Sequence, residues 1–179
     1  MAPFQADIRI FAHPQDIVPA LAGLDQADMV DSLPRDTTGR LTDDEFAQVK
    51  SHPRLGWQML SDSGVTDSVA LDVCLHHHEK MDGTGYPKGL TKEQMSVPAR
   101  MMAIADIFEA LTASDRPYKD GKPLSECLNI MGRMKENQHI DPDLFDIFID
   151  QKVYLQYAEQ FLKPGQLDEI DHSRIPGYL

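Results

Sequence analysis

The segment VPARMMAIADIFEALT, residues 97–112, decides the fold because apolar residues occupy almost every side of the helix that it predicts. A helix of this kind is buried at the centre of a helical domain. One carboxylate, Asp106, interrupts the apolar surface, and its neighbours one turn away are Met102 and Ala110. A charge in such surroundings is costly unless a cation or a strong hydrogen-bond donor lies beside it. The segment therefore predicts a helical core with a polar feature inside it.

The sequence on the carboxyl side of this helix predicts further helices. Residues 124–135, 142–150 and 153–162 each have a helical pattern, whereas the tail through IPGYL is expected to be loose. No convincing strand pattern competes with these helices. The predicted fold class is therefore all-α, and the 179 residues are enough for one well-cored domain.

The sequence on the amino side is less regular at first. Residues 1–40 predict only a short helix near 16–24 and a loop after it. Thr42 and Glu45 then match a capping box, and Pro53 must kink or restart the helix that follows. The expected apolar face of this helical region consists of Phe46, Val49, Leu55, Trp57 and Leu60.

Three consecutive histidines precede a glycine-rich turn in LHHHEKMDGTGYPKGL, residues 75–90. In a helix expected at about 67–79, His77 and His78 continue the buried apolar stripe. His76 falls on the other side of the helix and is expected to face solvent. The sequence thus points two imidazoles toward the core and one away from it.

The formal charge of −12 argues against nonspecific binding to nucleic acid or to an anionic membrane. Between His76 and Lys122, however, seven basic residues balance seven acidic ones, so an anionic ligand meets the least repulsion there. Cys74 and Cys127 form no metal-ligand pattern and are expected to be packed, reduced thiols. The sequence has neither a signal-peptide start nor an apolar run long enough to span a bilayer, so we expect a cytoplasmic location and no membrane partner.

Histidines beside a buried aspartate are candidate ligands for Fe, Mn, Zn or Co. Successive helix positions differ by about 100° of rotation, so His77 and His78 would serve two ions more readily than one. A pair of metal ions is a standard device for hydrolysing phosphate esters. His52, beside Pro53, is a further candidate ligand. Each ring could equally be an ordinary hydrogen-bonded core histidine, and spacing alone does not decide between these interpretations.

The segment HHEKMDGTGYPKGL resembles the signature of the HD-GYP family, bacterial metal-dependent phosphohydrolases that are typically cyclic di-GMP phosphodiesterases. Three further blocks resemble the family in the same order, namely LTDDEFAQVKSHPRLG, VPARMMAIADIFEALTASDRPYK and HIDPDLFDIFI. The resemblance implies a helical bundle of the HD-domain superfamily type. It also implies three parts: an irregular segment at 1–40 in place of the usual HD half, an HD-GYP-like domain at 41–150, and a carboxyl-terminal helix and tail at 151–179.

The resemblance also implies roles for individual residues. The metal-ligand positions of the family match His52, His77, His78 and Asp106, with divalent ions, Fe or Mn, as cofactors and two of them in an intact site. Substrate-binding positions match Tyr86, Arg116 and Lys119, the last two suited to holding phosphates. Residues that support the ligands or shape the loop are expected to be Glu79, Asp82, Gly83, Gly85, Pro87 and Arg100.

The sequence departs from the family pattern at the name-giving His-Asp dyad. The interval where it belongs reads ALAGLDQADMVDSLPRDTTGR, residues 20–40, and contains no His-Asp pair. His13 with Asp16 lies too far upstream to replace it, so the residues that would complete catalysis are unknown. Either the chain is the carboxyl-terminal part of a longer protein, with the rest of the site lost or supplied elsewhere, or it is a complete but degenerate member of the family. Both interpretations predict weakened metal chemistry.

The implied function is hydrolysis of cyclic di-GMP in bacterial second-messenger signalling, and whether this form is an active enzyme stays open at this point. The alternative is a catalytically degenerate module that binds a cyclic dinucleotide or regulates another protein. A phosphatase or nucleotidase with another substrate would differ only in the shape of its pocket. Beyond the substrate, the resemblance implies a second copy of the chain or a sensory or receiver domain as a partner.

Overall fold

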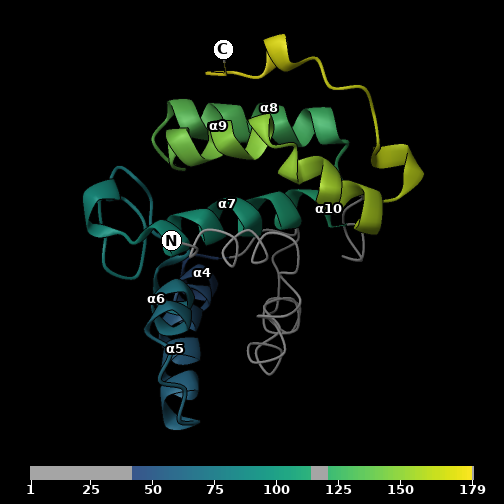
Figure 1. Cartoon of the computed structure of the whole chain (residues 1–179). Helices are drawn as coiled ribbons and strands as arrows, with labels where there is room; N and C mark the ends of the chain where they lie inside the picture. Colours follow the sequence, from purple (N-terminus) through teal and green to yellow (C-terminus); the bar gives the residue numbers. More distant parts are fainter. Residues whose placement is uncertain (1–41, 114–120, 179) are drawn as a thin grey trace, which may run out of the picture.

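The computed structural model describes residues 42–113 and 121–178 (Figure 1). The helix expected near 16–24 and the predicted substrate-binding residues Arg116 and Lys119 lie outside these ranges. The described helices are α4 (Asp43–Val49), α5 (His52–Asp62), α6 (Ser68–His76), α7 (Val97–Thr112), α8 (Leu124–Glu136), α9 (Pro142–Asp150) and α10 (Val153–Phe161). Short 3-10 helices are η1 (Lys92–Gln94), η2 (Pro164–Gln166) and η3 (His172–Arg174).

Helix α7 lies in the middle of the molecule, as its apolar sequence predicted. Figure 1 shows α4, α5 and α6 on one side of it and α8, α9 and α10 on the other. Its bounds agree with the predicted 97–112 because the sequence marks its start clearly: the Ser96 side chain accepts a hydrogen bond from the Ala99 amide, and Pro98 occupies the first turn. Ile104 and Phe108 are almost fully buried against the carboxyl-terminal helices.

Of the kink or restart predicted at Pro53, the structure shows a restart. Helix α4 begins with the predicted capping box, in which the Thr42 amide donates to Glu45 Oε2 at 2.6 Å. It ends at Val49, and α5 begins at His52 with Pro53 in its first turn, where proline lacks only an amide that would have no helical partner.

The predicted core face of this region is partly wrong. Leu60 is buried and Trp57 is half-buried, but Leu55 is 48% exposed and Phe46 is 45% exposed. The reason is that, among the described helices, α5 packs chiefly against α6, so only one of its faces is covered.

The main hydrophobic core lies between α7 and the carboxyl-terminal helices. Helix α9 has its predicted bounds, and α8 and α10 differ from prediction by one residue at one end. The buried members of this core include Leu128, Met131, Ile140, Phe145, Phe148, Ile149 and Tyr154. These helices support α7 on the side away from α5 and α6 (Figure 1).

The expectation of a loose tail is wrong. Ile175 is buried in the main core, and the Tyr178 hydroxyl donates to Asp150 Oδ1 at 2.5 Å. An ideal Cβ built on Gly132 of α8 would lie 2.5 Å from the carbonyl oxygen of Pro176, so the tail backbone touches α8 where only glycine leaves room. The sequence IPGYL reads as a loop because its contacts are with distant residues.

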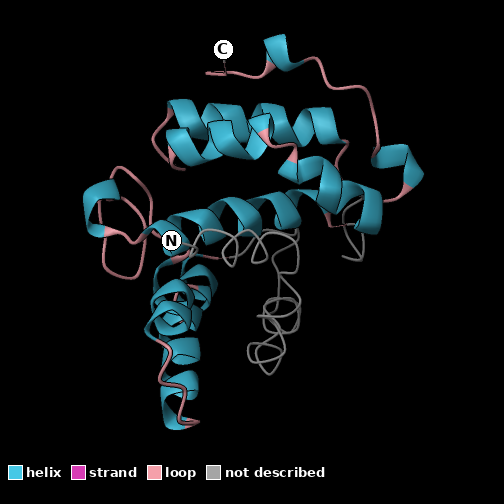
Figure 2. Cartoon of the chain, viewed as in Figure 1, coloured by secondary structure: helices cyan, strands magenta, loops and turns pink. Residues whose placement is uncertain are grey.

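Within residues 42–113 and 121–178 the structure contains no strand, only an isolated bridge between Asp82 and Thr91 (Figure 2). The predicted all-α class is therefore confirmed. In the same ranges, no helix combines the length and the apolar character that crossing a membrane would require.

Candidate metal centre

Three histidines from two places in the sequence meet at one point. His52 is the first residue of α5, His77 directly follows α6, and His78 is the next residue. Each offers a ring nitrogen, and the three nitrogens lie within 4.8 Å of one another. The structure thus brings together all three of the predicted histidine ligands.

The hydrogen bonds of His52 and His77 fix which ring nitrogens face each other. His52 Nδ1 lies 2.7 Å from the Val49 carbonyl oxygen, and His77 Nδ1 lies 2.9 Å from that of Cys74. A carbonyl only accepts, so both Nδ1 atoms carry hydrogen and, in neutral rings, both Nε2 atoms carry lone pairs. These Nε2 atoms are 3.2 Å apart. Two lone pairs at this distance repel each other unless a proton or a metal ion lies between them.

A proton is disfavoured at this point. Burial, the largest cause, lowers the pKa of both His52 and His77. The pKa of His78 is lowered to about 2, first by burial and then by the neighbouring imidazoles of His77 and His52. A metal ion fits better, because nitrogens 3.2 Å apart that each lie about 2.0–2.1 Å from one ion subtend about 100°, close to tetrahedral and octahedral angles. The donor set therefore suits a divalent cation.

Asp106 of α7 lies at the edge of this cluster. Its Oδ2 is 3.9 Å from His78 Nδ1, and both side chains are half-buried. The negative charge of Asp106 also acts to raise the pKa of His52, but burial has the larger effect and the pKa is lowered overall. The carboxylate thus lies beside His78 but outside the group of three ring nitrogens, and it comes from the helix whose apolar pattern first singled it out.

The expected position of His76 is wrong. The residue is only 8% exposed, because the start of α7 packs against the side of α6 that sequence periodicity assigned to solvent. His76 Nδ1 pairs with Asp72 Oδ1 at 2.8 Å, and Asp72 also accepts a hydrogen bond from the Ser96 hydroxyl. The predicted helix also extended three residues too far at its carboxyl end, since α6 ends at His76.

The glycine-rich loop folds back over the histidine segment. The Tyr86 amide donates to the His78 carbonyl at 3.2 Å, and the Tyr86 ring stacks on the His78 ring with centroids 4.8 Å apart. Gly85 is required here, since a Cβ would lie 2.4 Å from the Cα of Glu79. Burial, aided by the charge of Asp106, raises the pKa of Tyr86 to about 12. Its hydroxyl therefore keeps its proton at neutral pH.

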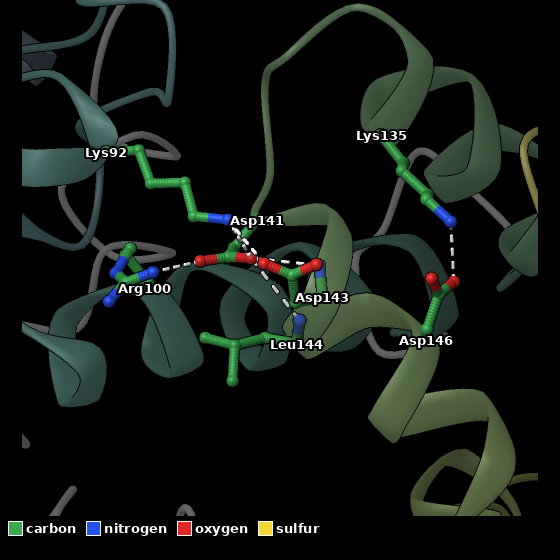
Figure 3. A network of polar contacts seen from close by, with 7 residues as sticks. All are labelled: Lys92, Arg100, Lys135, Asp141, Asp143, Leu144 and Asp146. Carbon is green, nitrogen blue, oxygen red and sulfur yellow. Dashed lines mark hydrogen bonds and ion pairs between the residues drawn. The ribbon is translucent and has the colours of Figure 1, made fainter.

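The other predicted support residues have distinct partners. Asp82 Oδ1 accepts from the amide and the hydroxyl of Thr84, which shapes the turn. The Gly83 backbone has a φ of +79°, and the Tyr86–Pro87 peptide is cis. Arg100 pairs with the buried Asp141, which also binds Lys92 (Figure 3).

Two residues near the site were not predicted from the sequence. His139 contributes to the lowered pKa of His78, and Lys50 Nζ lies 6.0 Å from the centre of the Tyr86 ring. His139 belongs to the HIDPDLFDIFI block, so its place in that block was the available signal. For Lys50 the signal was its position two residues before His52.

Comparison with known proteins identifies relatives of this chain. The chain is 49% identical to Cyclic di-GMP phosphodiesterase PA4108 of Pseudomonas aeruginosa over 139 residues, covering 76% of this chain and 33% of that protein. It is 35% identical to the cyclic di-GMP phosphodiesterase response regulator RpfG of Xanthomonas campestris pv. campestris, covering 71% and 35%. It is 38% identical to 3'3'-cGAMP-specific phosphodiesterase 3 of Vibrio cholerae, covering 77% and 28%.

The chain spans about a third of the length of these curated relatives. A family model described as HD domain matches residues 31–144, which is more than half of the 179 residues. The chain therefore belongs to the HD domain family, as its resemblance to the HD-GYP type predicted.

Proposed function

We propose that this chain carries the histidine half of a cyclic dinucleotide phosphodiesterase site of the HD-GYP type. The observation that supports this most strongly is the pair of Nε2 lone pairs of His52 and His77, which face each other at 3.2 Å. The names of relatives that cover 71–77% of the chain include both cyclic di-GMP and 3'3'-cGAMP phosphodiesterases. We select cyclic di-GMP as the substrate because the relative at 49% identity is named for it.

In this proposal His52, His77, His78 and Asp106 hold divalent metal, Fe or Mn, with two ions in an intact site. Bound metal would supply a Lewis acid and a water of lowered pKa, the usual requirements for hydrolysing a phosphodiester. Main-chain carbonyl groups of the chain orient the metal ligands. The carbonyls of Val49 and Cys74 hold the rings of His52 and His77.

Three further residues would bind the dinucleotide. The Tyr86 hydroxyl, protonated at neutral pH, can donate a hydrogen bond to a phosphoryl oxygen. Arg116 and Lys119 would neutralise the phosphates, since guanidinium and ammonium groups make charge-assisted hydrogen bonds to them. A stacked ring beside a metal centre also offers an apolar face to a nucleobase.

The test measures metal binding and hydrolysis separately. Purified chain, loaded anaerobically with Fe(II) or with Mn(II), is assayed for metal content by mass spectrometry and for cleavage of cyclic di-GMP by chromatography. We expect bound metal in the parent chain and a loss of it in His77→Ala. The control His172→Gln changes a histidine in η3 that bonds to Tyr154, and it should retain the metal.

The outcomes separate the two functional interpretations. Metal binding with release of linear dinucleotide or GMP supports the phosphodiesterase. Binding of cyclic di-GMP without cleavage by the metal-loaded chain would support the degenerate binding module instead. Equal metal content in the parent, His77→Ala and His172→Gln would refute the metal centre itself.

A further inference from the structure

The carboxylate of Glu79 has a pair of partners that the metal centre does not explain. Glu79 follows His78 directly and is only 1% exposed. Its Oε1 accepts a hydrogen bond from the Lys88 amide at 2.6 Å, and its Oε2 accepts one from the Leu90 amide at 2.9 Å. Each oxygen thus binds a different backbone amide of the glycine-rich loop. In the described part of the chain, no ion pair involves this carboxylate.

These two hydrogen bonds act on the segment that follows Tyr86. The loop leaves the histidine segment at Asp82, approaches it again at Tyr86, and then passes Lys88 and Leu90 on its way to η1. The Glu79 side chain therefore holds residues 88–90 of the loop close to the backbone that carries His78. This arrangement requires a carboxylate, because a side-chain amide has one accepting oxygen and would present an NH2 group to the second amide donor.

The outer ends of the loop are attached elsewhere. Asp82 bridges Thr91, and the Asp82 amide donates to the Gln138 carbonyl at 3.1 Å. Lys92 binds Asp141 and Asp143 of the α9 amino terminus (Figure 3). These contacts hold the base of the loop against the α8–α9 turn, whereas Glu79 acts on its inner turn beside the histidines.

We propose that Glu79 is a positioning residue that fixes the Tyr86 ring against the His78 ring and so shapes the dinucleotide-binding face of the site. It acts through the Lys88 and Leu90 amides and binds neither metal nor ligand itself. The inference rests on the proposed function only for the identity of the ligand. The geometric part depends on contacts within the chain alone.

The geometric part is tested by nuclear magnetic resonance of the metal-free chain. Tyr86→Leu removes the stacked ring, so the change in the His78 ring-proton shift between it and the parent measures the ring-current effect. Glu79→Gln should lose most of this shift, whereas Glu93→Gln, an exposed glutamate of η1, should retain it. If the His78 ring-proton shift in Glu79→Gln equals that in the parent chain, the proposal is overturned.

The functional part is tested by calorimetry with cyclic di-GMP on the metal-loaded chain. Glu79→Gln should bind about tenfold more weakly at unchanged metal content, since one buried amide loses its acceptor. Tyr86→Ala should weaken binding similarly, and the double variant should be no worse than either single variant, because both changes act on the same contact. Additive losses, or a fall in metal content in Glu79→Gln, would contradict a positioning role.

The proposal can still be tested if Glu79→Gln does not fold or if the parent chain does not bind cyclic di-GMP. If Glu79→Gln does not fold, amide hydrogen exchange in the parent chain replaces it: the Lys88 and Leu90 amides must be protected, and unprotected exchange at both would overturn the proposal. If the parent chain does not bind cyclic di-GMP, the proposed substrate fails. The His78 shift then still decides whether Glu79 positions Tyr86.

Discussion

Replacing Asp141 tests whether a buried ion cluster holds the loop, α7 and α9 together. Asp141 is fully buried, accepts from the amides of Asp143 at 3.0 Å and Leu144 at 3.3 Å, and pairs with Arg100 and with Lys92 at 3.1 Å (Figure 3). Asp141→Asn preserves the shape and the helix cap but removes the charge, which leaves two cations facing a neutral amide.

The expected loss follows from the burial of the partners. Removing one member of a buried ion pair costs about 3–5 kcal/mol, and the partial exposure of Lys92 and Arg100 places Asp141→Asn near about 3 kcal/mol. Asp141→Ala also loses the cap, which adds about 1 kcal/mol. For a chain of this length, about 3 kcal/mol corresponds to a fall in Tm of about 6–12 °C.

Urea unfolding followed by circular dichroism measures the effect, with Asp143→Asn as the matched control. Asp143 binds the same Lys92, but its side chain is 81% exposed, so its loss should cost no more than a surface ion pair is worth. If Asp141→Asn and Asp143→Asn unfold at the same urea concentration, the reasoning from burial is wrong.

The pH dependence provides a second check on Asp141. Burial alone would raise the pKa of this carboxyl, but hydrogen bonds from Lys92, the Leu144 amide and Arg100 outweigh it and the pKa is lowered. A lowered carboxyl pKa stabilises the fold above the unfolded value of about 4, and this stability is lost as the pH falls through the folded value. The stability difference between the parent and Asp141→Asn should therefore be constant near neutral pH and shrink below about pH 4.

Two further predictions concern the histidine cluster and the tail. Because the pKa values of the clustered histidines are lowered, the metal-free chain should lose stability as the pH falls below about 6.5. The loss should reach up to about 1.4 kcal/mol per pH unit for each ring. His78→Gln should reduce this slope, which urea titrations at pH 5, 6 and 7 measure. An unchanged slope in His78→Gln would contradict the lowered pKa. Gly132→Ala should cost about 1–3 kcal/mol and expose the tail to proteolysis, since its Cβ would overlap the Pro176 carbonyl, whereas Gly165→Ala, with open space around it, should match the parent. Equal proteolysis of these two variants would show that the tail is not held by α8.

The features that the sequence predicted best are those with local causes. Helices α7 and α9 have their predicted bounds because a cap residue and a proline mark each start, Ser96 with Pro98 and Asp141 with Pro142. The restart at Pro53 is equally local. Such elements depend on residues within one helical turn, and a single sequence displays them directly.

The features that the sequence misjudged depend on distant contacts. Periodicity placed His76 toward solvent because it cannot show that the start of α7, about twenty residues later, covers that side of α6. For the same reason it assigned Leu55 to the core and the tail with Ile175 to a loose end. The meeting of His52 with His77 and His78 was likewise beyond periodicity, and there the family resemblance supplied what the pattern could not.

The orientation of each of the two facing histidines has a local cause, a hydrogen bond to a carbonyl at the end of a helix. His52 donates from Nδ1 to the carbonyl three residues earlier, at the last residue of α4, and His77 does the same to Cys74 in the last turn of α6. Each ring is thus aligned by a main-chain carbonyl three residues before it. Packing of α5 against α6 then brings the two Nε2 atoms to 3.2 Å. The alignment of these imidazoles therefore has causes within residues 49–77, and we expect a missing His-Asp dyad to change the number of ions held and the attacking water more than this alignment.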